Sequence, residues 1–148
     1  MIKGDSEVIK FKFTSCKNNI NYEFTAKCTY ELSEEYEGFI YTFEVYEECK
    51  EDDDTFSLIL LVMKNGNDLK VVDLNPDSCK YYLGKGISIS LILKCREIFG
   101  KRIVSSSNLK KSAYCEWNSS LAIEKVWKPL VKLGFAIYVK EEDQYIVF

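Results

Sequence analysis

The stretch Leu83-Gly84-Lys85-Gly86-Ile87-Ser88 is the most informative part of this chain, because its neighbours on both sides are regular. A β-like segment at residues 69–74 precedes it, and a run with helical apolar spacing at residues 89–99 follows it. Glycines let the backbone pass close to a ligand, and the first N–H groups of a helix have no partner inside the helix. A strand, a glycine loop and a helix start could therefore hold a phosphate group, although the same residues also suit a plain tight turn.

The N-terminal half has the two-residue periodicity of β-strands. Apolar and polar residues alternate in three segments, which predicts half-buried strands at residues 8–14, 20–32 and 39–46. The apolar run at 56–63 predicts a strand buried on both faces, and Asn65-Gly66 predicts a hairpin turn into 69–74. One polar face on the longest segment is typical of an antiparallel sheet.

The periodicity becomes helical after the glycine loop. Apolar residues at 87, 91, 95 and 98 predict an amphipathic helix that ends at Gly100. The remaining segments predict a short strand at 102–106, a polar loop at 107–114, a second helix at 116–133 and a closing hairpin of 135–140 with 144–148. Pro129 should kink or interrupt the second helix, and Gly134 should end it.

These segments together predict one α+β domain over residues 1–148. We expect a mixed, mostly antiparallel sheet with two main helices and a β-rich N-terminal half. The net charge of −3 argues weakly against a nucleic-acid partner, because phosphate binding needs a basic surface. Apolar runs stay well short of the roughly 18 residues of a membrane helix, and the acidic start is unlike a signal peptide, so we expect a cytoplasmic protein without membrane contact.

Cysteine and histidine usage narrows the chemistry. The six cysteines, at 16, 28, 49, 79, 95 and 115, include no C-x-x-C pair, so we expect neither a zinc site nor a disulfide set. Cys28 and Cys95 occupy periodic apolar positions, which predicts buried free thiols. The chain contains no histidine, which excludes Ser-His-Asp and Cys-His nucleophile pairs and most catalytic zinc sites. An enzyme of this composition must use carboxylates, Tyr, Cys, Lys, water or a cofactor.

The C-terminal half resembles the GCN5-related N-acetyltransferases, the GNAT fold. In that family a strand leads into a loop of pattern Arg/Gln-x-x-Gly-x-Gly/Ala, which residues 83–88 resemble. Val72-Asp73-Leu74-Asn75-Pro76 resembles the preceding strand end, and Lys132-Leu133-Gly134-Phe135 resembles the exit of the next helix. A closing β-hairpin is also expected of the fold. The resemblance covers about residues 71–148.

The resemblance implies that acetyl-coenzyme A is the cofactor and that its acetyl group passes directly to an amine of an unknown small molecule or protein. The implied cofactor-binding residues are Val72, Leu74, Gly84, Lys85, Gly86, Ile87 and Ser88. The loop residues would bind the pyrophosphate, and the main chain of 69–74 would pair with the pantetheine arm. An oligomer is possible, and no metal is implied.

The acid and base are not identified by the sequence. Glu44 is a candidate base, and Tyr114 and Tyr138 are candidate acids, although surface exposure and packing explain these residues as well. Residues 105–108, Ser-Ser-Ser-Asn, could line a cleft or form a loop. Trp117 and Trp127 are most simply core residues.

Three departures from the family pattern keep other functions open. Leu83 stands where the family usually has Arg or Gln, Ser88 replaces a smaller residue, and Leu130 stands where many members carry a tyrosine that protonates the leaving thiolate. One alternative is therefore a catalytically inactive GNAT-like binding or assembly module. Another is an unrelated α+β interaction domain, which would lack the splayed parallel strands typical of the GNAT fold.

Overall fold

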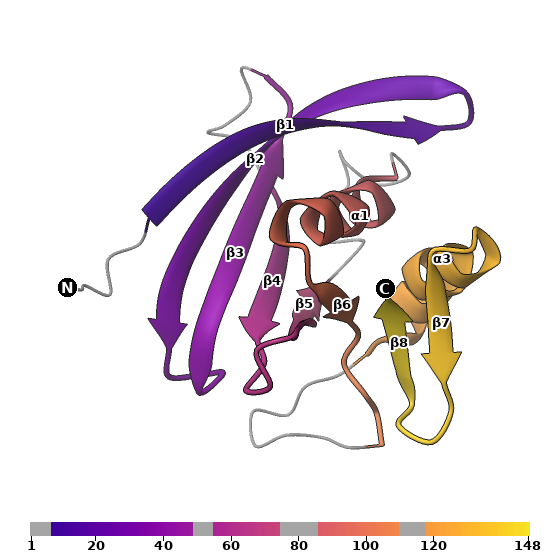
Figure 1. Ribbon diagram of the computed structural model, residues 1–148. Helices are drawn as coiled ribbons and strands as arrows, with labels where there is room; N and C mark the ends of the chain where they lie inside the picture. Colours follow the sequence, from indigo (N-terminus) through magenta and orange to yellow (C-terminus); the bar gives the residue numbers. More distant parts are fainter. Residues whose placement is uncertain (1–6, 49–54, 75–85, 110–117) are drawn as a thin grey trace.

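A single curled sheet organises the molecule (Figure 1). The structure is a computed structural model that describes residues 7–48, 55–74, 86–109 and 118–148. In these residues the sheet has eight strands in the order β1-β2-β3-β4-β5-β6-β8-β7. The fold is thus α+β with a mostly antiparallel sheet, as the sequence periodicity predicts.

The first five strands form an antiparallel meander in which each strand pairs with the next along the chain. They are β1 (Glu7–Lys17), β2 (Ile20–Ser33), β3 (Gly38–Tyr46), β4 (Phe56–Val62) and β5 (Asp68–Leu74). The alternation predicted for β2 is confirmed: Phe24, Ala26 and Cys28 are buried on one face. The ends of the same face are open, since Ile20 and Leu32 are exposed.

The C-terminal part contains the helices and three further strands. They are α1 (Ile87–Phe99), β6 (Arg102–Val104), α2 (Ser120–Ala122), the π-helical segment η2 (Ile123–Trp127), α3 (Lys128–Lys132), β7 (Ala136–Val139) and β8 (Gln144–Val147). Among the described strands, β5 and β6 are the one parallel pair, and α1 connects them. The helix α1 lies within the curl of the sheet, next to β1 (Figure 1).

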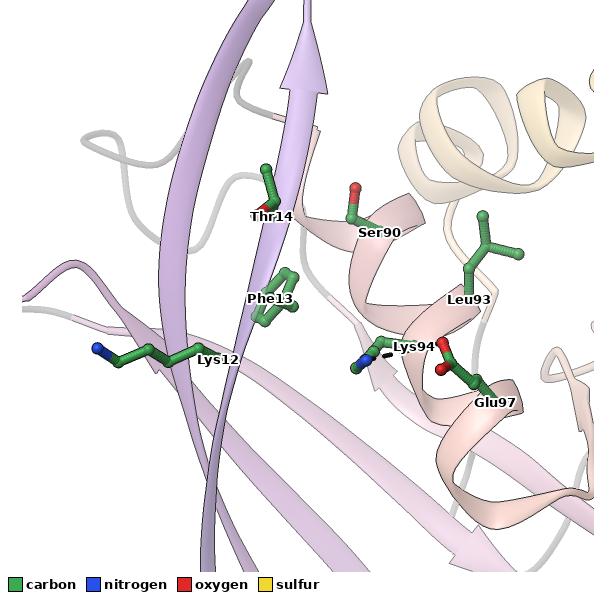
Figure 2. Close-up of a pocket in the computed structure, with 7 residues that line it drawn as sticks. All are labelled: Lys12, Phe13, Thr14, Ser90, Leu93, Lys94 and Glu97. Atoms are coloured by element: carbon green, nitrogen blue, oxygen red, sulfur yellow. Dashed lines mark ion pairs between the residues drawn. The ribbon is translucent and has the colours of Figure 1, made fainter.

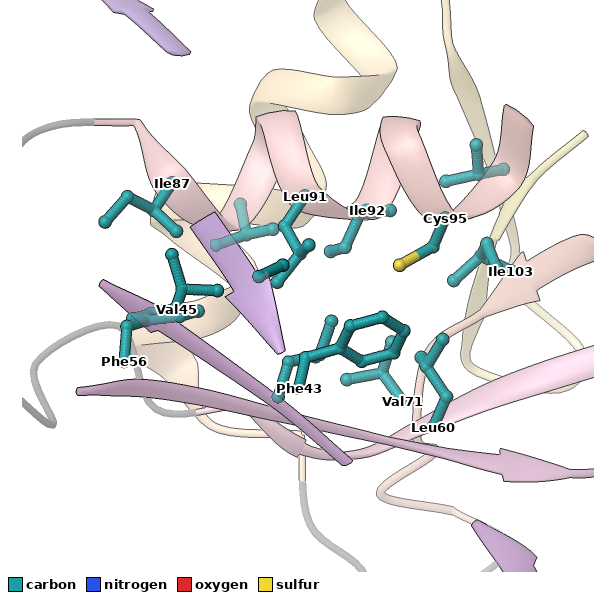
Figure 3. Packing of buried hydrophobic residues seen from close by; sticks show 14 of the residues in the cluster. Phe43, Val45, Phe56, Leu60, Val71, Ile87, Leu91, Ile92, Cys95 and Ile103 are labelled. Carbon is teal, nitrogen blue, oxygen red and sulfur yellow. The ribbon is translucent and has the colours of Figure 1, made fainter. Parts of the chain in front are cut away.

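The main core lies between α1 and the inner face of the sheet. Leu91, Ile92 and Cys95 from α1 are fully buried against strand residues such as Phe43 and Leu60 (Figure 3). Aromatic rings extend this core past the end of the helix. The ring of Phe99 lies 4.5 Å from that of Tyr41 and meets the ring of Phe43 edge-on at 6.2 Å. Cys28 and Cys95 are both buried and free, as predicted.

The second helix differs from the expected single helix over 116–133. The described helix starts at Ser120, where the Ser119 side chain accepts a hydrogen bond from the Ala122 N–H at 3.1 Å. The Lys128 N–H then bonds to the Ile123 carbonyl five residues back, so the middle of the helix is π-helical. Because Pro129 has no N–H and its ring crowds the preceding turn, a wider turn just before it is a physical consequence. The predicted interruption is therefore confirmed, whereas residues 116 and 117 lie outside the described part.

Among the described residues, no helix is long and apolar enough to cross a membrane.

Candidate functional site

The parallel strands β5 and β6 are held together at their beginnings. Asp68, Leu69 and Lys70 pair with residues 102–104, and the ladder ends there. Arg102 donates two hydrogen bonds to the Asp68 carboxylate, Nε to Oδ1 at 2.7 Å and one terminal nitrogen to Oδ2 at 2.9 Å. These hydrogen bonds hold the pKa of Asp68 below its ordinary value.

Beyond the ladder the two chains part. The Ser105 N–H bonds to the Tyr145 carbonyl at 2.9 Å, so the chain after β6 follows β8 rather than β5. The Ser106 hydroxyl then donates to the Val71 carbonyl at 2.7 Å. A side chain thus replaces the main-chain ladder at this point, and residues 72–74 of β5 have no ladder to β6 in the described chain.

A β-bulge lies where the strands part. Val71 pairs with Leu60 and Asp73 pairs with Ile59, so Val72 is the extra residue. The bulge places the side chain of Val72 in the small cluster on the outer face of the sheet, whereas Leu74 packs against the main core. The two predicted cofactor residues of β5 therefore point to opposite faces.

The predicted phosphate loop is described only from Gly86 onward, and Gly84 and Lys85 lie outside the described residues. Gly86 caps α1 with a φ of 73° and no side-chain cap. Ile87 and Ser88 follow in the first turn with buried side chains, and the backbone N–H groups of a first helical turn have no partner inside the helix. The first turn contains no acidic residue, so no side chain of that turn neutralises the positive end of the helix dipole.

The end of β1 contacts the start of α1. A Cβ placed on Gly86 would lie 2.9 Å from the Ser15 hydroxyl and 3.6 Å from the Cys16 carbonyl oxygen. The Lys17 side chain is also close, with its Cβ 3.7 Å from the same point. Glycine is therefore favoured at position 86 by contact as well as by conformation, a reason that the sequence pattern does not reveal.

A polar groove runs between β1 and α1 (Figure 2). It has a volume of about 450 Å³ and is lined by Lys12, Phe13, Thr14, Ser90, Leu93, Lys94 and Glu97. The Lys94 ammonium lies 3.7 Å from the Glu97 carboxylate. The volume is within the usual range of small-molecule sites. The apolar spacing that predicts α1 does not indicate that β1 lies opposite its polar residues Ser90, Lys94 and Glu97.

The serines after β6 form hydrogen bonds to main-chain groups of other segments and do not line a cleft. The Ser105 hydroxyl accepts from the Tyr145 N–H and donates to the Ser106 carbonyl, both at 2.9 Å. The Ser107 hydroxyl donates to the Glu142 carbonyl at 2.8 Å. All three serines are buried, so the loop alternative fits them better than the cleft alternative.

Asn108 also forms hydrogen bonds that connect separate segments. Its side-chain amide donates to the Asn118 carbonyl at 2.8 Å, and its side-chain oxygen accepts from the Asn118 N–H at 2.9 Å. The Asn108 N–H also bonds to the Asp143 carboxylate at 2.9 Å. These bonds join the two ends of the segment between residues 108 and 118 to the closing hairpin.

The other candidate acids and bases are also separated from α1. Tyr138 donates to Asp143 at 2.7 Å, and this hydrogen bond raises the Tyr138 pKa to about 12. Glu44 pairs across strands with Lys27 and Ser57, on the face opposite to the core. Leu130 is fully buried. Tyr114 lies outside the described residues.

The tryptophan prediction is confirmed in the described residues for Trp127, which is buried and stacks on Tyr145 at 6.0 Å. Trp117 lies outside them. In the described part of the chain no group of three His, Cys, Asp or Glu residues could hold a metal ion.

The geometry therefore brings together Gly86, Ile87, Ser88 and the end of β1, and it separates them from Glu44 and Tyr138. Comparison with known proteins found no matching family model, no matching curated protein and no matching solved structure.

Proposed function

We propose that this chain is an acyl-coenzyme A-dependent N-acetyltransferase of the GNAT type, acting on an unknown amine. The observation that carries the proposal is the β5–α1–β6 unit, in which a short parallel ladder ends at Lys70 and the chains then part. The splayed parallel strands expected of the GNAT fold have this form. The closing hairpin of β7 and β8 next to β6 also agrees with the expectation.

The N-terminus of α1 and the point where β5 and β6 part lie at the same end of the strands. Because α1 connects two parallel strands, its N-terminus follows the carboxyl end of β5. Ligands of open sheets with parallel strands bind outside the carboxyl ends of the strands. The backbone N–H groups of residues 86–88 would donate to the pyrophosphate there, and Lys85 would add positive charge.

The pantetheine arm has less main chain to pair with than the sequence suggested. Leu69 and Lys70 already pair with β6, which leaves the part of β5 beyond Val71. An extended arm there would accept and donate main-chain hydrogen bonds as an added strand does. The amine nitrogen would then attack the thioester carbon, the thiolate of coenzyme A would leave, and the amine proton would pass to a base or to water.

A specific set of contacts favours the second candidate, an inactive GNAT-like binding module. Leu130 is buried in the core where an acid would be needed, and the Tyr138 phenol is bonded to Asp143. Glu44 lies on the face of the sheet opposite to the core. Cofactor binding without turnover is the expected property of such a module.

Calorimetric titration with acetyl-coenzyme A and coenzyme A tests the proposal. Gly86 is a poor position for the test variant, because a side chain there would crowd the Ser15 hydroxyl and adopt a strained positive φ, so a loss of binding could reflect a change of fold. We therefore choose Lys85→Glu, with Lys64→Glu as a matched charge reversal in the exposed turn after β4. We expect micromolar binding in the wild type and in Lys64→Glu, and at least a tenfold weaker affinity in Lys85→Glu.

Turnover separates the two candidates. Release of the free thiol is followed with an aromatic disulfide reagent while panels of small amines and peptide amines are screened. Thiol release that depends on an amine supports the transferase. Binding without release across the panels supports the inactive module. No heat at millimolar ligand, from a folded sample, would refute a coenzyme A site altogether.

A further inference from the structure

The outer edge of β1 borders the polar groove. Lys12, Phe13 and Thr14 all line this groove, although successive side chains of a strand point to opposite faces. In Figure 2 the Phe13 ring points toward α1, whereas the Lys12 side chain points to the other side of β1. A groove that residues of both faces line runs along the edge of the strand. Because β2 pairs with the other edge, this is the edge that no strand of the described chain covers.

The turn after β1 determines which main-chain groups point away from β2. Asn18-Asn19 forms a two-residue turn with φ angles of 53° and 65°, the type I′ geometry, so Lys17 and Ile20 exchange hydrogen bonds across it. Hydrogen-bonded and non-hydrogen-bonded pairs alternate along an antiparallel ladder. Counting back from Lys17, both Lys12 and Thr14 are in non-hydrogen-bonded pairs, so their N–H and C=O groups point toward the outer edge.

A contact further along the strand supports this direction. Cys16 has the same place in the alternation as Lys12 and Thr14, and its carbonyl oxygen lies 3.6 Å from the point that a Cβ on Gly86 would occupy. The main-chain groups of this edge therefore face α1. One wall of the groove thus presents main-chain donors and acceptors, and the other wall presents the polar face of the helix.

We propose that an acidic, extended peptide of a partner protein binds along this edge as an added strand, between β1 and α1. Hydrogen bonds to the main chain of Lys12 and Thr14 supply affinity, and alternate side chains of the peptide supply specificity. The peptide residue opposite Phe13 points to the inner face, where Phe13 and Leu93 form the apolar part of the groove. The residue opposite Lys12 points to the outer face beside an exposed ammonium group, so an acidic side chain suits that position.

The new site does not depend on the proposed cofactor site. The described residues proposed to bind coenzyme A, 86–88, are not among the residues that line the groove.

Charge favours an acidic peptide over a second copy of this chain. Within the groove Lys94 pairs with Glu97 at 3.7 Å, and Lys12 adds a further positive charge. On β2, Glu23 and Lys27 lie on the same face as Lys12 and offset each other. A second copy pairing through β1 would bring together two strands that each carry three lysines and one glutamate, and like charges opposed across strands are destabilising.

Fluorescence anisotropy of the full chain with two synthetic peptides tests the proposal. In one peptide glutamate alternates with valine, and in the other lysine replaces glutamate. We expect the dissociation constant of the glutamate peptide to be at least about tenfold lower. Lys12→Glu should reverse this preference, whereas Lys64→Glu, a charge reversal in the exposed turn after β4, should leave it unchanged. Failure of both peptides to bind at about 1 mM, or an unchanged preference in Lys12→Glu, would overturn the proposal.

A proline variant tests the main-chain pairing. Thr14→Pro removes an N–H on the outer edge and leaves the ladder with β2 intact, because proline is tolerated on an edge strand where the N–H faces away from the sheet. This variant should bind the glutamate peptide at least about tenfold more weakly. Unchanged binding by the folded variant would contradict strand addition.

A change in the peptide gives a test that does not depend on the folding of a variant. In an added strand, alternate N–H groups point toward β1. N-methylation of one alternate set of peptide residues should therefore abolish binding, and N-methylation of the other set should weaken it much less. Equal effects of the two sets would contradict strand addition. Self-association of the chain that the glutamate peptide does not reverse, measured by sedimentation, would assign the edge to a second copy and overturn the proposal.

Discussion

Replacing Gly86 with alanine should destabilise the fold more than the same replacement at the other end of the same helix. Gly86 and Gly100 flank α1 with similar positive φ angles of 73° and 63°. Alanine in this left-handed region costs roughly 1–2 kcal/mol at either position. At Gly86 the new Cβ would also lie 2.9 Å from the Ser15 hydroxyl, whereas at Gly100 nothing lies within 4 Å. Ser15 is fully buried, so its hydroxyl would have to shift within the packed interior.

The difference between the two variants isolates the contact between β1 and α1. Crowding of a well-packed site costs typically about 1–3 kcal/mol. We therefore expect Gly86→Ala to lose about 2–5 kcal/mol of unfolding free energy and Gly100→Ala to lose about 1–2 kcal/mol. Urea denaturation followed by tryptophan fluorescence measures both, because Trp127 is buried next to Tyr145. Equal losses within about 0.5 kcal/mol would refute the argument that β1 presses on the helix start.

Three further predictions concern single groups. Asp68→Asn should lower the free energy of unfolding by about 1–2 kcal/mol above pH 5. Because the native pKa of Asp68 is lowered, the stabilisation is present above the ordinary carboxyl pKa of about 4 and is lost as pH falls through the native pKa. The acid unfolding curves of wild type and variant should therefore converge. Ser106→Ala should lower the free energy of unfolding in urea by about 1–3 kcal/mol, since it leaves the Val71 carbonyl without its hydrogen-bond donor at 2.7 Å. An unchanged free energy of unfolding would contradict a structural role for this hydrogen bond. Among the three cysteines that the structure describes, thiol labelling of the folded protein at pH 8 should modify the exposed Cys16 but neither buried thiol, because burial raises the pKa of Cys28 to about 12 and also raises the pKa of Cys95. Peptide mapping identifies the labelled sites, and labelling of Cys28 and Cys95 in folded protein would contradict this prediction.

The order and type of the described elements could be predicted from the sequence because two periods dominate it. Alternation identified β2, and three-and-four spacing identified α1, since each pattern reports a single buried face. The bulge at Val72 breaks this rule, because Val72 and Leu74 are two residues apart and yet lie on opposite faces of the sheet.

The candidate site was less predictable because its contacts are non-local. The spacing of the glycines predicted a turn before α1, but nothing near Gly86 in sequence indicates that Ser15 would lie against it. The run of serines was compatible with a cleft and with a loop. Local sequence does not show whether a serine hydroxyl bonds to a distant carbonyl, as those of Ser106 and Ser107 do, or faces solvent. The wider turn before Pro129 was half predicted, since proline forbids a regular helix without specifying what replaces it.

The meander also has a consequence for folding kinetics. Each of its ladders joins neighbouring segments, so the chain between them is short and its closure costs little entropy. The parallel pair is different, because Asp68 and Arg102 are 34 residues apart and α1 must form between them. Topology of this kind slows folding, since distant contacts must form before they stabilise anything. We expect the five-stranded meander to be structured in the transition state and the insertion of β6 between β5 and β8 to complete the sheet afterwards.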